Sequence, residues 1–320
     1  MKALLVVVLA LSALYSGYWF IATQGLNSGL DSAMSAAETR GWDIDAETLD
    51  KSGFPSRFDV TATNVAVRSP SDFVEWRAPV VQTAALSYRP NSVIATLPPE
   101  QTLRLGQQVL AIGSENLRAN VKVAASPSLA FEALTAEAAT LNIRSDAGWQ
   151  ATTGAALIAM RAAGPAANTY EGYVSLANIM PVLPLAGLPD TAAQMTADIT
   201  AVLDRPLDRT TPTQPPLLET LTISEIDLSW GSLRLGGTGE VTVDAGGYPD
   251  GRILLQVANW RDMLALANGA GVVPPNLLPA LTSGLRMLSG GSDNLQLPLT
   301  FAGGDMMLGP LPLGPAPRLR

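Results

Sequence analysis

Cysteine and histidine are both absent from this sequence of 320 residues. Without cysteine, the chain forms no disulfide and offers no thiolate to a metal ion. Without histidine, it lacks the commonest metal ligand and the usual general base near neutral pH. These absences exclude histidine-dependent triads, cysteine nucleophiles and most zinc and haem sites. The sequence therefore predicts a protein that is not an enzyme, with no catalytic residues, no metal site and no cofactor.

Charge is also scarce. Charged residues make up 15% of the chain, and the formal net charge is -8. The basic residues are nearly all arginines scattered singly, so no basic patch matches a phosphate backbone, and we expect no nucleic-acid partner. Hydrophobic residues make up 47% of the sequence, which is enough to fill the core of a globular protein.

The stretch from Ala3 to Ala22 has no charged residue and is predicted to form one membrane-spanning helix. At about 1.5 Å per residue, a helix of this length matches a hydrocarbon core of roughly 30 Å. The alternative is a cleaved signal peptide, whose shorter apolar core precedes a small-x-small site. Here the apolar run continues through Tyr15, Trp19 and Phe20, which suits an interfacial aromatic belt. An uncleaved anchor is therefore favoured.

Lys2 lies on the short side of this stretch, and the acidic bulk of the chain follows it. The positive-inside rule then places that bulk outside the cytoplasm. We therefore expect a single-pass protein of a bacterial inner membrane, with residues 42–320 in the periplasm.

Residues 23–41 continue the helical spacing as an amphipathic helix, which Gly41 should end. Beyond Gly41 the apolar period changes to two, and short strand-like runs follow one another with turn signals between them. The alanine-rich piece from Glu132 to Ala139 fits a strand or a helix. The predicted organisation is an anchor over 1–22, a helix over 23–41, a first β half over 42–165 and a second β half with two helices over 166–320.

Two stretches indicate a curved sheet. Near Asn64 the apolar set slips by one residue, which marks a β-bulge or a change of exposed face. From Leu221 to Leu235 the register changes twice, which predicts one long strand bent at two points. The fold class is thus mainly β: an N-terminal transmembrane helix, then a large curved antiparallel sheet, in one piece or two halves, with a few packed helices near the C-terminus.

The two C-terminal helices follow from apolar stripes at helical spacing. Asn259 is predicted to cap a helix from Trp260 to Asn268, and Asn276 to cap a second one that follows Pro274-Pro275. Both helices should lie against the sheet.

Few residues suggest chemistry. Three acidic pairs are Asp43 with Asp45, Asp204 with Asp208, and Asp244 with Asp250. Two carboxylates alone make a poor calcium site, and sequence does not set the separation that a glycosidase requires. The run from Gly236 to Gly239 matches no phosphate-binding pattern and is interpreted as a turn. A serine nucleophile activated by lysine would need Lys51 or Lys122, and neither has a serine three residues before it.

Four arginines are spread over the first strands: Arg57, Arg77, Arg89 and Arg104. They would meet an anionic headgroup only if their strands bring them together. Otherwise they are ordinary outward-facing residues.

Several short motifs occur in a fixed order: Gly53-Phe54-Pro55-Ser56-Arg57-Phe58-Asp59, Trp76-Arg77-Ala78-Pro79, Tyr88-Arg89-Pro90-Asn91-Ser92-Val93-Ile94 and Leu308-Gly309-Pro310-Leu311-Pro312-Leu313-Gly314. With the N-terminal anchor before them, they resemble the bacterial family catalogued as domain of unknown function 2125. This resemblance implies an envelope protein with no assigned activity.

A looser resemblance joins the anchor and long sheet, with Leu228-Ser229-Trp230-Gly231 and Gly239-Glu240-Val241-Thr242-Val243, to the AsmA-like envelope proteins. It implies a curved sheet with an apolar trough that holds lipid. Our first hypothesis is therefore an anchored periplasmic protein that binds a lipid or another hydrophobic partner on a curved sheet. The alternatives are a scaffolding module for another envelope protein and, less favoured, a histidine-free hydrolase.

Overall fold

The structure is a computed structural model that describes residues 2–164, 168–183, 189–211, 213–271, 273 and 276–319. Side chains are not described for residues 2–13, 22, 26, 27, 30 and 33. Within this part of the chain there are three helices: α1 (Lys2–Glu38), α2 (Trp260–Gly269) and α3 (Leu278–Ser289). All strands belong to one sheet with antiparallel pairing, so the prediction of a mainly β protein built on a large antiparallel sheet is confirmed.

The sheet has 20 strands. The strands of its first half are β1 (Asp43–Asp45), β2 (Thr48–Ser52), β3 (Arg57–Arg68), β4 (Val74–Leu86), β5 (Arg89–Thr96), β6 (Glu100–Leu105), β7 (Gln108–Glu115), β8 (Arg118–Val123), β9 (Phe131–Ala138), β10 (Thr140–Ser145), β11 (Gln150–Thr153) and β12 (Ala156–Ala162). The others are β13 (Thr169–Val182), β14 (Ala193–Leu203), β15 (Leu218–Trp230), β16 (Leu233–Val243), β17 (Pro249–Ala258), β18 (Asn294–Ala302), β19 (Asp305–Leu308) and β20 (Leu311–Pro315).

Eight consecutive strands form pairs that lie end to end. β5 and β6 both pair with β4, while β11 and β12 both pair with β13. Between them, β8 and β9 continue from β5 to β12, and β7 and β10 continue from β6 to β11. Backbone hydrogen bonds bridge the breaks, for example from Ser114 N to Pro99 O at 2.8 Å and from Gly154 N to Ala177 O at 2.8 Å. The sheet is therefore continuous and bends along one line, which we call the crease.

The crease runs through Asn64, Pro79, Pro99, Asn116 and Asn178. The three asparagines adopt positive φ angles of 48°, 54° and 53°, a conformation that asparagine tolerates better than most residues. Where a strand crosses the crease through an asparagine, the side chains that face inward change from every even-numbered to every odd-numbered residue, or the reverse. The slip predicted at Asn64 is thus confirmed as a change of face, because the pairing of β3 with β4 keeps one register on both sides of it.

Small side chains fill the inner corner of the crease. Ala78, Ser114, Ala138 and Ala156 come from four different strands and are all buried. A sheet that folds back on itself leaves little space at its concave corner, so larger residues would force the two walls apart.

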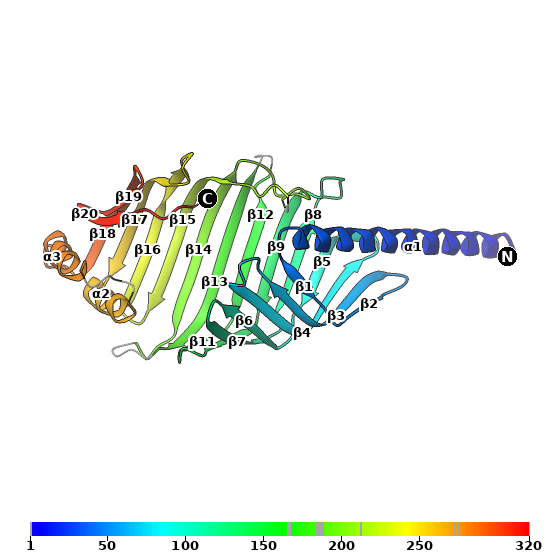
Figure 1. The fold of residues 1–320 in the computed structure, drawn as a ribbon, viewed down its shortest axis with the longest axis horizontal. Coiled ribbons are helices and arrows are strands. Elements are labelled where there is room, and N and C mark those ends of the chain that lie inside the picture. The colour runs from blue at the N-terminus through cyan, green and yellow to red at the C-terminus, as the bar shows by residue number, and fades with distance from the viewer. Residues whose placement is uncertain are drawn as a thin grey trace.

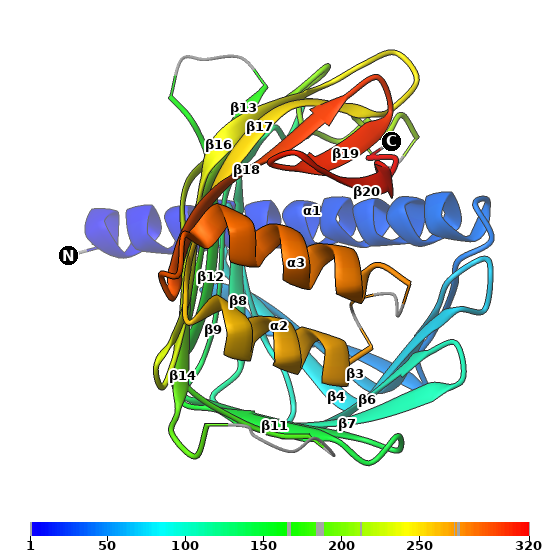
Figure 2. The same cartoon turned by 90° about the vertical axis from the view of Figure 1, so that its left-hand side faces the viewer.

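The bent sheet forms a trough. Figure 2 shows it nearly end-on: β8, β9, β12 and β14 stand as one wall, and β7 and β11 lie across the bottom. Helices α2 and α3 lie on the concave side at one end, and α1 lies at the other end, where its N-terminus projects beyond the sheet (Figure 1).

Helix α1 is continuous from Lys2 to Glu38, so the segment after residue 22 continues the N-terminal helix, as predicted. It ends shortly before Gly41, whose φ is 81°, as predicted. No described helix combines the length and the mean hydropathy needed to cross a membrane. Of the predicted anchor, the side chains of residues 3–13 and Ala22 lie outside the described part.

Several local predictions are corrected. Residues 221–235 form two strands, because β15 and β16 pair as a hairpin around Gly231, and only the bend between Ile223 and Ile226 lies within a strand. Gly236 to Gly239 lie inside β16 and not in a turn. A Cβ on Gly239 would overlap the backbone of Arg252 on β17, so glycine is required by the close approach of the two strands.

Of the two predicted helix caps, Asn259 occupies the expected N-cap position without capping through its side chain, and Asn276 does not occupy the cap position. Asn259 precedes α2 with a left-handed backbone and makes no side-chain capping bond, because its amide donates to the Ser232 carbonyl instead. Leu277, and not Asn276, is the cap residue of α3. The helices themselves are confirmed. Pro274 and Pro275 lie outside the described residues.

Of the remaining open points, residues 132–138 are strand, as part of β9. The division at 165–166 falls in residues 165–167, which are outside the described part. The strands on either side of it, β12 and β13, pair directly.

Candidate hydrophobic ligand site

A row of apolar residues crosses the concave face of the sheet in register. Starting under α1, each residue is the cross-strand partner of the next: Phe58, Ala85, Val93, Val121, Leu134, Met160, Gly172, Ile199, Ile223, Gly239, Ile253 and Leu299. We call this the apolar row. Neighbouring strands lie about 4.8 Å apart, so the row extends over more than about 50 Å.

A second row lies beside it and is also apolar: Ala95, Ala119, Ala136, Ile158, Val174, Ala197 and Ile226. The bulge in β15 between Ile223 and Ile226 keeps both rows on one face, because it inserts an extra residue where the alternation would otherwise reverse.

The two ends of this face are covered. At the C-terminal end Trp260 of α2 and Leu285 of α3 are buried against Leu295 and Leu297 of β18. At the N-terminal end α1 lies over β3, with Trp19 stacked on Phe58 at 5.7 Å between ring centroids.

The middle of the face is exposed. Val121 on β8 is 40% exposed and Ile158 on β12 is 48% exposed, although both belong to the apolar side of the sheet. Figure 1 shows α2 and α3 at one end of the sheet and the N-terminal part of α1 beyond the other end. An apolar face of this kind is typical of a binding surface.

An apolar cavity lies at each end of the exposed stretch. The cavity beneath α1 has a volume of about 470 Å³ and is lined by Met34, Phe58, Val81 and Val93 among others. The cavity beneath α2 measures about 220 Å³, and its lining, which includes Leu228, is entirely apolar. The exposed rows thus lead at both ends into hollows that the helices do not fill.

Three aromatic residues fasten α1 to the sheet. The Tyr15 hydroxyl shares a hydrogen bond with Ser87 Oγ at 2.7 Å, and the Tyr18 hydroxyl donates to the Ser87 carbonyl at 2.8 Å. Trp19 Nε1 donates to the Arg57 carbonyl at 3.0 Å. We call these contacts the α1 clamp. The sequence placed the aromatic residues in an interfacial belt, and no pattern in it indicated their partners.

The four arginines singled out from the sequence separate into two pairs. Arg77 and Arg104 both bind Glu75, together with Arg68, while Arg57 and Arg89 line another cavity. Glu75 is buried, and its hydrogen bonds from Arg104 first, then from Arg77 and Arg68, lower its pKa to about 2. We call this set the Glu75 cluster.

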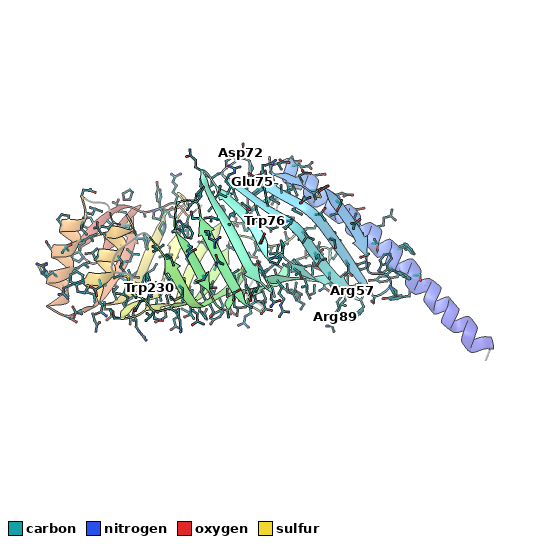
Figure 3. All side chains as sticks on the ribbon, turned by 90° about the horizontal axis from the view of Figure 1, so that it is seen from below. Arg57, Asp72, Glu75, Trp76, Arg89 and Trp230 are labelled. Atoms are coloured by element: carbon teal, nitrogen blue, oxygen red, sulfur yellow. The ribbon has the colours of Figure 1, made fainter. Side chains whose placement is uncertain are left out.

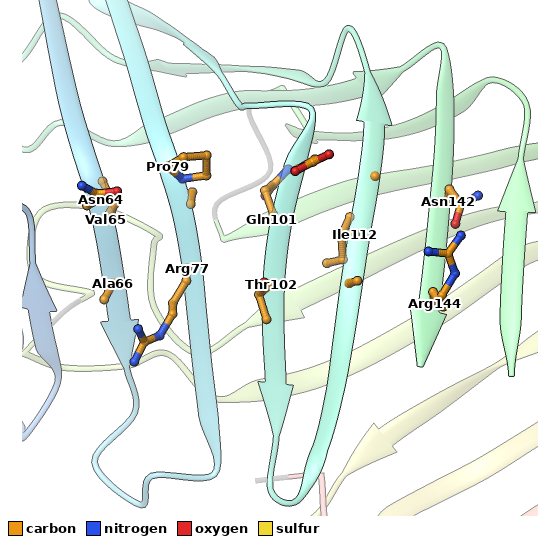
Figure 4. A pocket seen from close by; sticks show the side chains of 14 residues that line it. Asn64, Val65, Ala66, Arg77, Pro79, Gln101, Thr102, Ile112, Asn142 and Arg144 are labelled. Carbon is orange, nitrogen blue, oxygen red and sulfur yellow. The ribbon is translucent and has the colours of Figure 1, made fainter. Parts of the chain in front are cut away.

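Next to the cluster, on the face opposite the apolar row, a polar cavity of about 660 Å³ spans β3, β4, β6, β7 and β10. Figure 4 shows Arg77 and Arg144 on its lining, with Asn64, Gln101 and Asn142. Arg77, one of the two arginines on this lining, is already paired with Glu75.

The acidic pairs are dispersed. Asp43 pairs with Arg68, and Asp204 pairs with Arg205. Asp208 accepts hydrogen bonds from the backbone and side chain of Thr210, which lower its pKa. Among the described residues no group of three or more acidic side chains is placed to hold a metal ion.

The remaining candidates are likewise separate. Asp244 and Asp250 flank the β16–β17 turn, where Asp244 accepts from the Tyr248 N–H. Lys122 pairs with Glu132, and Lys51 lies on β2. A hydrolase constellation is therefore not assembled from these residues.

Comparison with known proteins gives one match. The model of the family described as "Uncharacterized protein conserved in bacteria (DUF2125)" matches residues 19–317. No curated protein and no solved structure matches the chain.

Proposed function

The chain belongs to the uncharacterised bacterial family DUF2125, and on this premise we propose that it binds a lipid, or another elongated hydrophobic molecule, along the concave face of its sheet. Binding is proposed without catalysis. The observation that carries the proposal is the apolar row, which stays in register from β3 to β18 and is exposed in its middle.

The size of the exposed stretch supports an acyl chain as ligand. It spans the neighbouring strands β5, β8, β9, β12, β13 and β14. At about 4.8 Å per strand this amounts to roughly 24 Å. Each Å² of apolar surface removed from water contributes about 25 cal/mol, so a long thin apolar molecule lying in the trough gains free energy along its whole length.

Anchoring belongs to the same proposal. Residues 3–22 carry no charge, and α1 projects beyond the sheet at its N-terminus (Figure 1). We propose that the projecting part of α1, before the contacts of Tyr15, Tyr18 and Trp19 with the sheet, enters a bacterial inner membrane and that the sheet lies in the periplasm. A charge at the centre of the stretch, as in Leu9→Arg, should move the protein from the membrane fraction to the soluble fraction. Recovery of that variant in the membrane fraction would contradict the anchor.

Two isoleucines provide a matched test of ligand binding. Ile158 on the concave face is 48% exposed, and Ile94 on the opposite face is 46% exposed. Placing a carboxylate against an acyl chain is costly, so Ile158→Asp should weaken binding of a fluorescent fatty acid on the order of tenfold or more. Ile94→Asp should leave the affinity unchanged.

Lipids that copurify with the full chain, identified by mass spectrometry, give the second readout. They should be depleted more strongly in Ile158→Asp than in Ile94→Asp, whose carboxylate would lie in a cavity beside Arg57 and Lys122 on the opposite face. Equal affinity and equal lipid content in the two variants would refute the proposal. A crosslink at position 158 that traps one envelope protein and no lipid would favour the scaffolding function instead.

A further inference from the structure

The end of the sheet beside the α1 clamp exposes large apolar side chains. Phe20 and Ile21 lie on α1 directly after the clamp, Phe54 lies in the loop before β3, and Tyr88 lies in the turn between β4 and β5. Tyr88 is 66% exposed and Phe54 is 53% exposed. Phe20 and Phe54 stack with ring centroids 6.2 Å apart, so segments far apart in the sequence form one surface, which we call the tip.

The loop that presents Phe54 has a defined shape. Gly53 adopts a φ of 105°, and its Cβ position would lie 2.7 Å from the Arg57 carbonyl oxygen. The Arg57 N–H donates to the Gly53 carbonyl at 2.8 Å, and Ser87 N donates to Ser56 O at 3.0 Å. The exposed aromatic residue is therefore held outward by a closed loop.

Three cations lie beside these apolar residues. Arg57, Arg89 and Lys122 line a cavity of about 730 Å³ together with Asn91 and Ser92. They come from the start of β3, the start of β5 and the end of β8, which meet because Ser92 pairs with Lys122 and Arg57 pairs with Leu86. Figure 3 shows Arg57 and Arg89 at the end of the sheet from which α1 projects.

Carboxylates balance this charge in part. Arg57 pairs with Asp59 at 2.9 Å, and Lys122 pairs with Glu132 at 2.6 Å, while both cations keep more than half of their side-chain surface exposed. Among the described residues no carboxylate forms an ion pair with Arg89. In a chain with a net charge of -8, this is a local concentration of accessible cations.

We propose that the tip docks on the headgroup layer of an anionic phospholipid bilayer. Phe20, Phe54 and Tyr88 would lie at the boundary between headgroups and acyl chains, where aromatic rings are favoured, and Arg57, Arg89 and Lys122 would contact lipid phosphates. A soluble anion would satisfy the cations alone. The adjoining exposed apolar side chains gain free energy only at an interface, which favours a bilayer over a soluble ligand.

This inference deepens the proposed function, on whose anchor it rests, because docking fixes how the trough meets the bilayer. The clamp joins α1 to the tip through hydrogen bonds, so a helix inserted at residues 3–14 brings the tip to the membrane surface. The concave face would then begin at the bilayer, beneath α1, where the apolar cavity of about 470 Å³ lies.

The absence of cysteine allows a direct test on the full chain. Ser56→Cys places a polarity-sensitive fluorophore on the tip loop, and Ser292→Cys places the same label beyond α3 at the other end. Each protein is reconstituted into vesicles of phosphatidylcholine alone or with added phosphatidylglycerol. The label at position 56 should report an apolar environment that strengthens with phosphatidylglycerol and weakens with salt, while the label at 292 reports water in every case.

Removing the cations should reverse docking. Each basic residue near an anionic surface contributes about a fivefold change, so the triple variant Arg57→Gln, Arg89→Gln and Lys122→Gln should lower the docked-to-undocked ratio on the order of 100-fold. Arg234→Gln, Arg252→Gln and Arg286→Gln change the net charge equally on β16, β17 and α3, and should leave docking intact.

The outcomes separate this inference from the proposed function. A label at position 56 that reports water in both vesicles, while fatty-acid binding persists, overturns docking alone. Equal losses in the two triple variants would also overturn it, because net charge and not the tip would be responsible. If the wild-type chain docks on the vesicles but does not bind fatty acid, the proposal of a ligand in the trough is rejected and the proposal of docking through the tip stands.

Discussion

The two ends of the trough are held by different kinds of contact. At the C-terminal end, Trp260 and Leu285 are buried against Leu295 and Leu297, in a cluster with few polar atoms. At the N-terminal end, α1 is held by three aromatic side chains whose polar atoms reach Ser87, Pro55 and Arg57. Apolar burial stabilises without regard to direction, whereas hydrogen bonds fix the position of one element on another.

This difference indicates separate roles for the helices. The C-terminal helices close the trough and supply stability through burial. Helix α1 is long, and most of its described side chains between Leu14 and Glu38 are not buried. Its attachment at one level sets the direction in which its N-terminal part projects. A stability loss is therefore expected at one end and a loss of orientation at the other.

The largest effect is expected from Trp260→Ala. Trp260 is 3% exposed, and its ring nitrogen donates to the Ser292 carbonyl at 3.1 Å. Removing a buried tryptophan side chain costs about 3–5 kcal/mol. Urea unfolding should show this loss, and Trp42→Ala, at a half-exposed residue beyond α1, should change the free energy of unfolding by less than about 1 kcal/mol. Equal losses would mean that α2 contributes little to the core.

An intermediate effect is expected from Gly53→Ala. The substitution strains a positive φ and also places a Cβ too close to the Arg57 carbonyl oxygen, so we expect a loss of about 1–3 kcal/mol. Gly148→Ala is the control, because its φ is 86° and its Cβ would meet open space. Amide exchange should increase around residues 53–57 only in the first variant. Equal losses of stability and equal amide exchange in the two variants would show that the loop around Gly53 accommodates the added Cβ without a free-energy cost.

A smaller effect is expected from Tyr18→Phe. It removes the hydrogen bond to the Ser87 carbonyl and keeps the ring, so the cost is about 0.5–1.5 kcal/mol. Because the clamp acts on orientation, amide exchange should rise in α1 and not in α3. Tyr88→Phe, at an exposed turn residue, is the matched control. Faster exchange in both helices would indicate a global loss and contradict a local role for the clamp.

Much of the fold was predictable from local pattern. The alternation of β14, with Met195, Ala197 and Ile199 on one face, and the apolar stripe of α3 both identify their elements without tertiary information. The change of face at Asn64 was visible because apolar residues occur on both sides of it. The hairpin at Gly231 was missed, because a two-residue turn between apolar strands resembles a bend in one strand.

The sequence predicted the type of the candidate site but not the residues that form it. Curvature and an apolar face follow from the sequence, whereas the apolar row depends on cross-strand register over a dozen strands, which no single segment encodes. Glu75 and its arginines lie on three strands and carry no local signal of their meeting. The missing capping bond of Asn259 has a similar reason, since its side-chain amide donates to the carbonyl of Ser232, which is distant in the sequence.

The last comparison is between apolar and ionic stabilisation, and Glu75 tests it through pH. Its pKa is lowered from 4.5 to about 2, so the folded state holds the proton less tightly than the unfolded chain. The stabilisation is therefore complete above pH 4.5 and is lost as the pH falls towards 2. Unfolding midpoints measured across this range should fall more in wild type than in Glu75→Gln, and the two should converge near pH 2.

Arg77→Gln leaves Arg104 and Arg68 in place. Its unfolding midpoint should therefore differ from that of wild type in the same direction as that of Glu75→Gln, but by less. In wild type at low pH, amide exchange should rise first in β4 and β6, before the buried cluster around Trp260 responds. A gap between wild type and Glu75→Gln that stays constant from neutral pH to pH 2 would show that the carboxylate charge does not stabilise this end of the sheet.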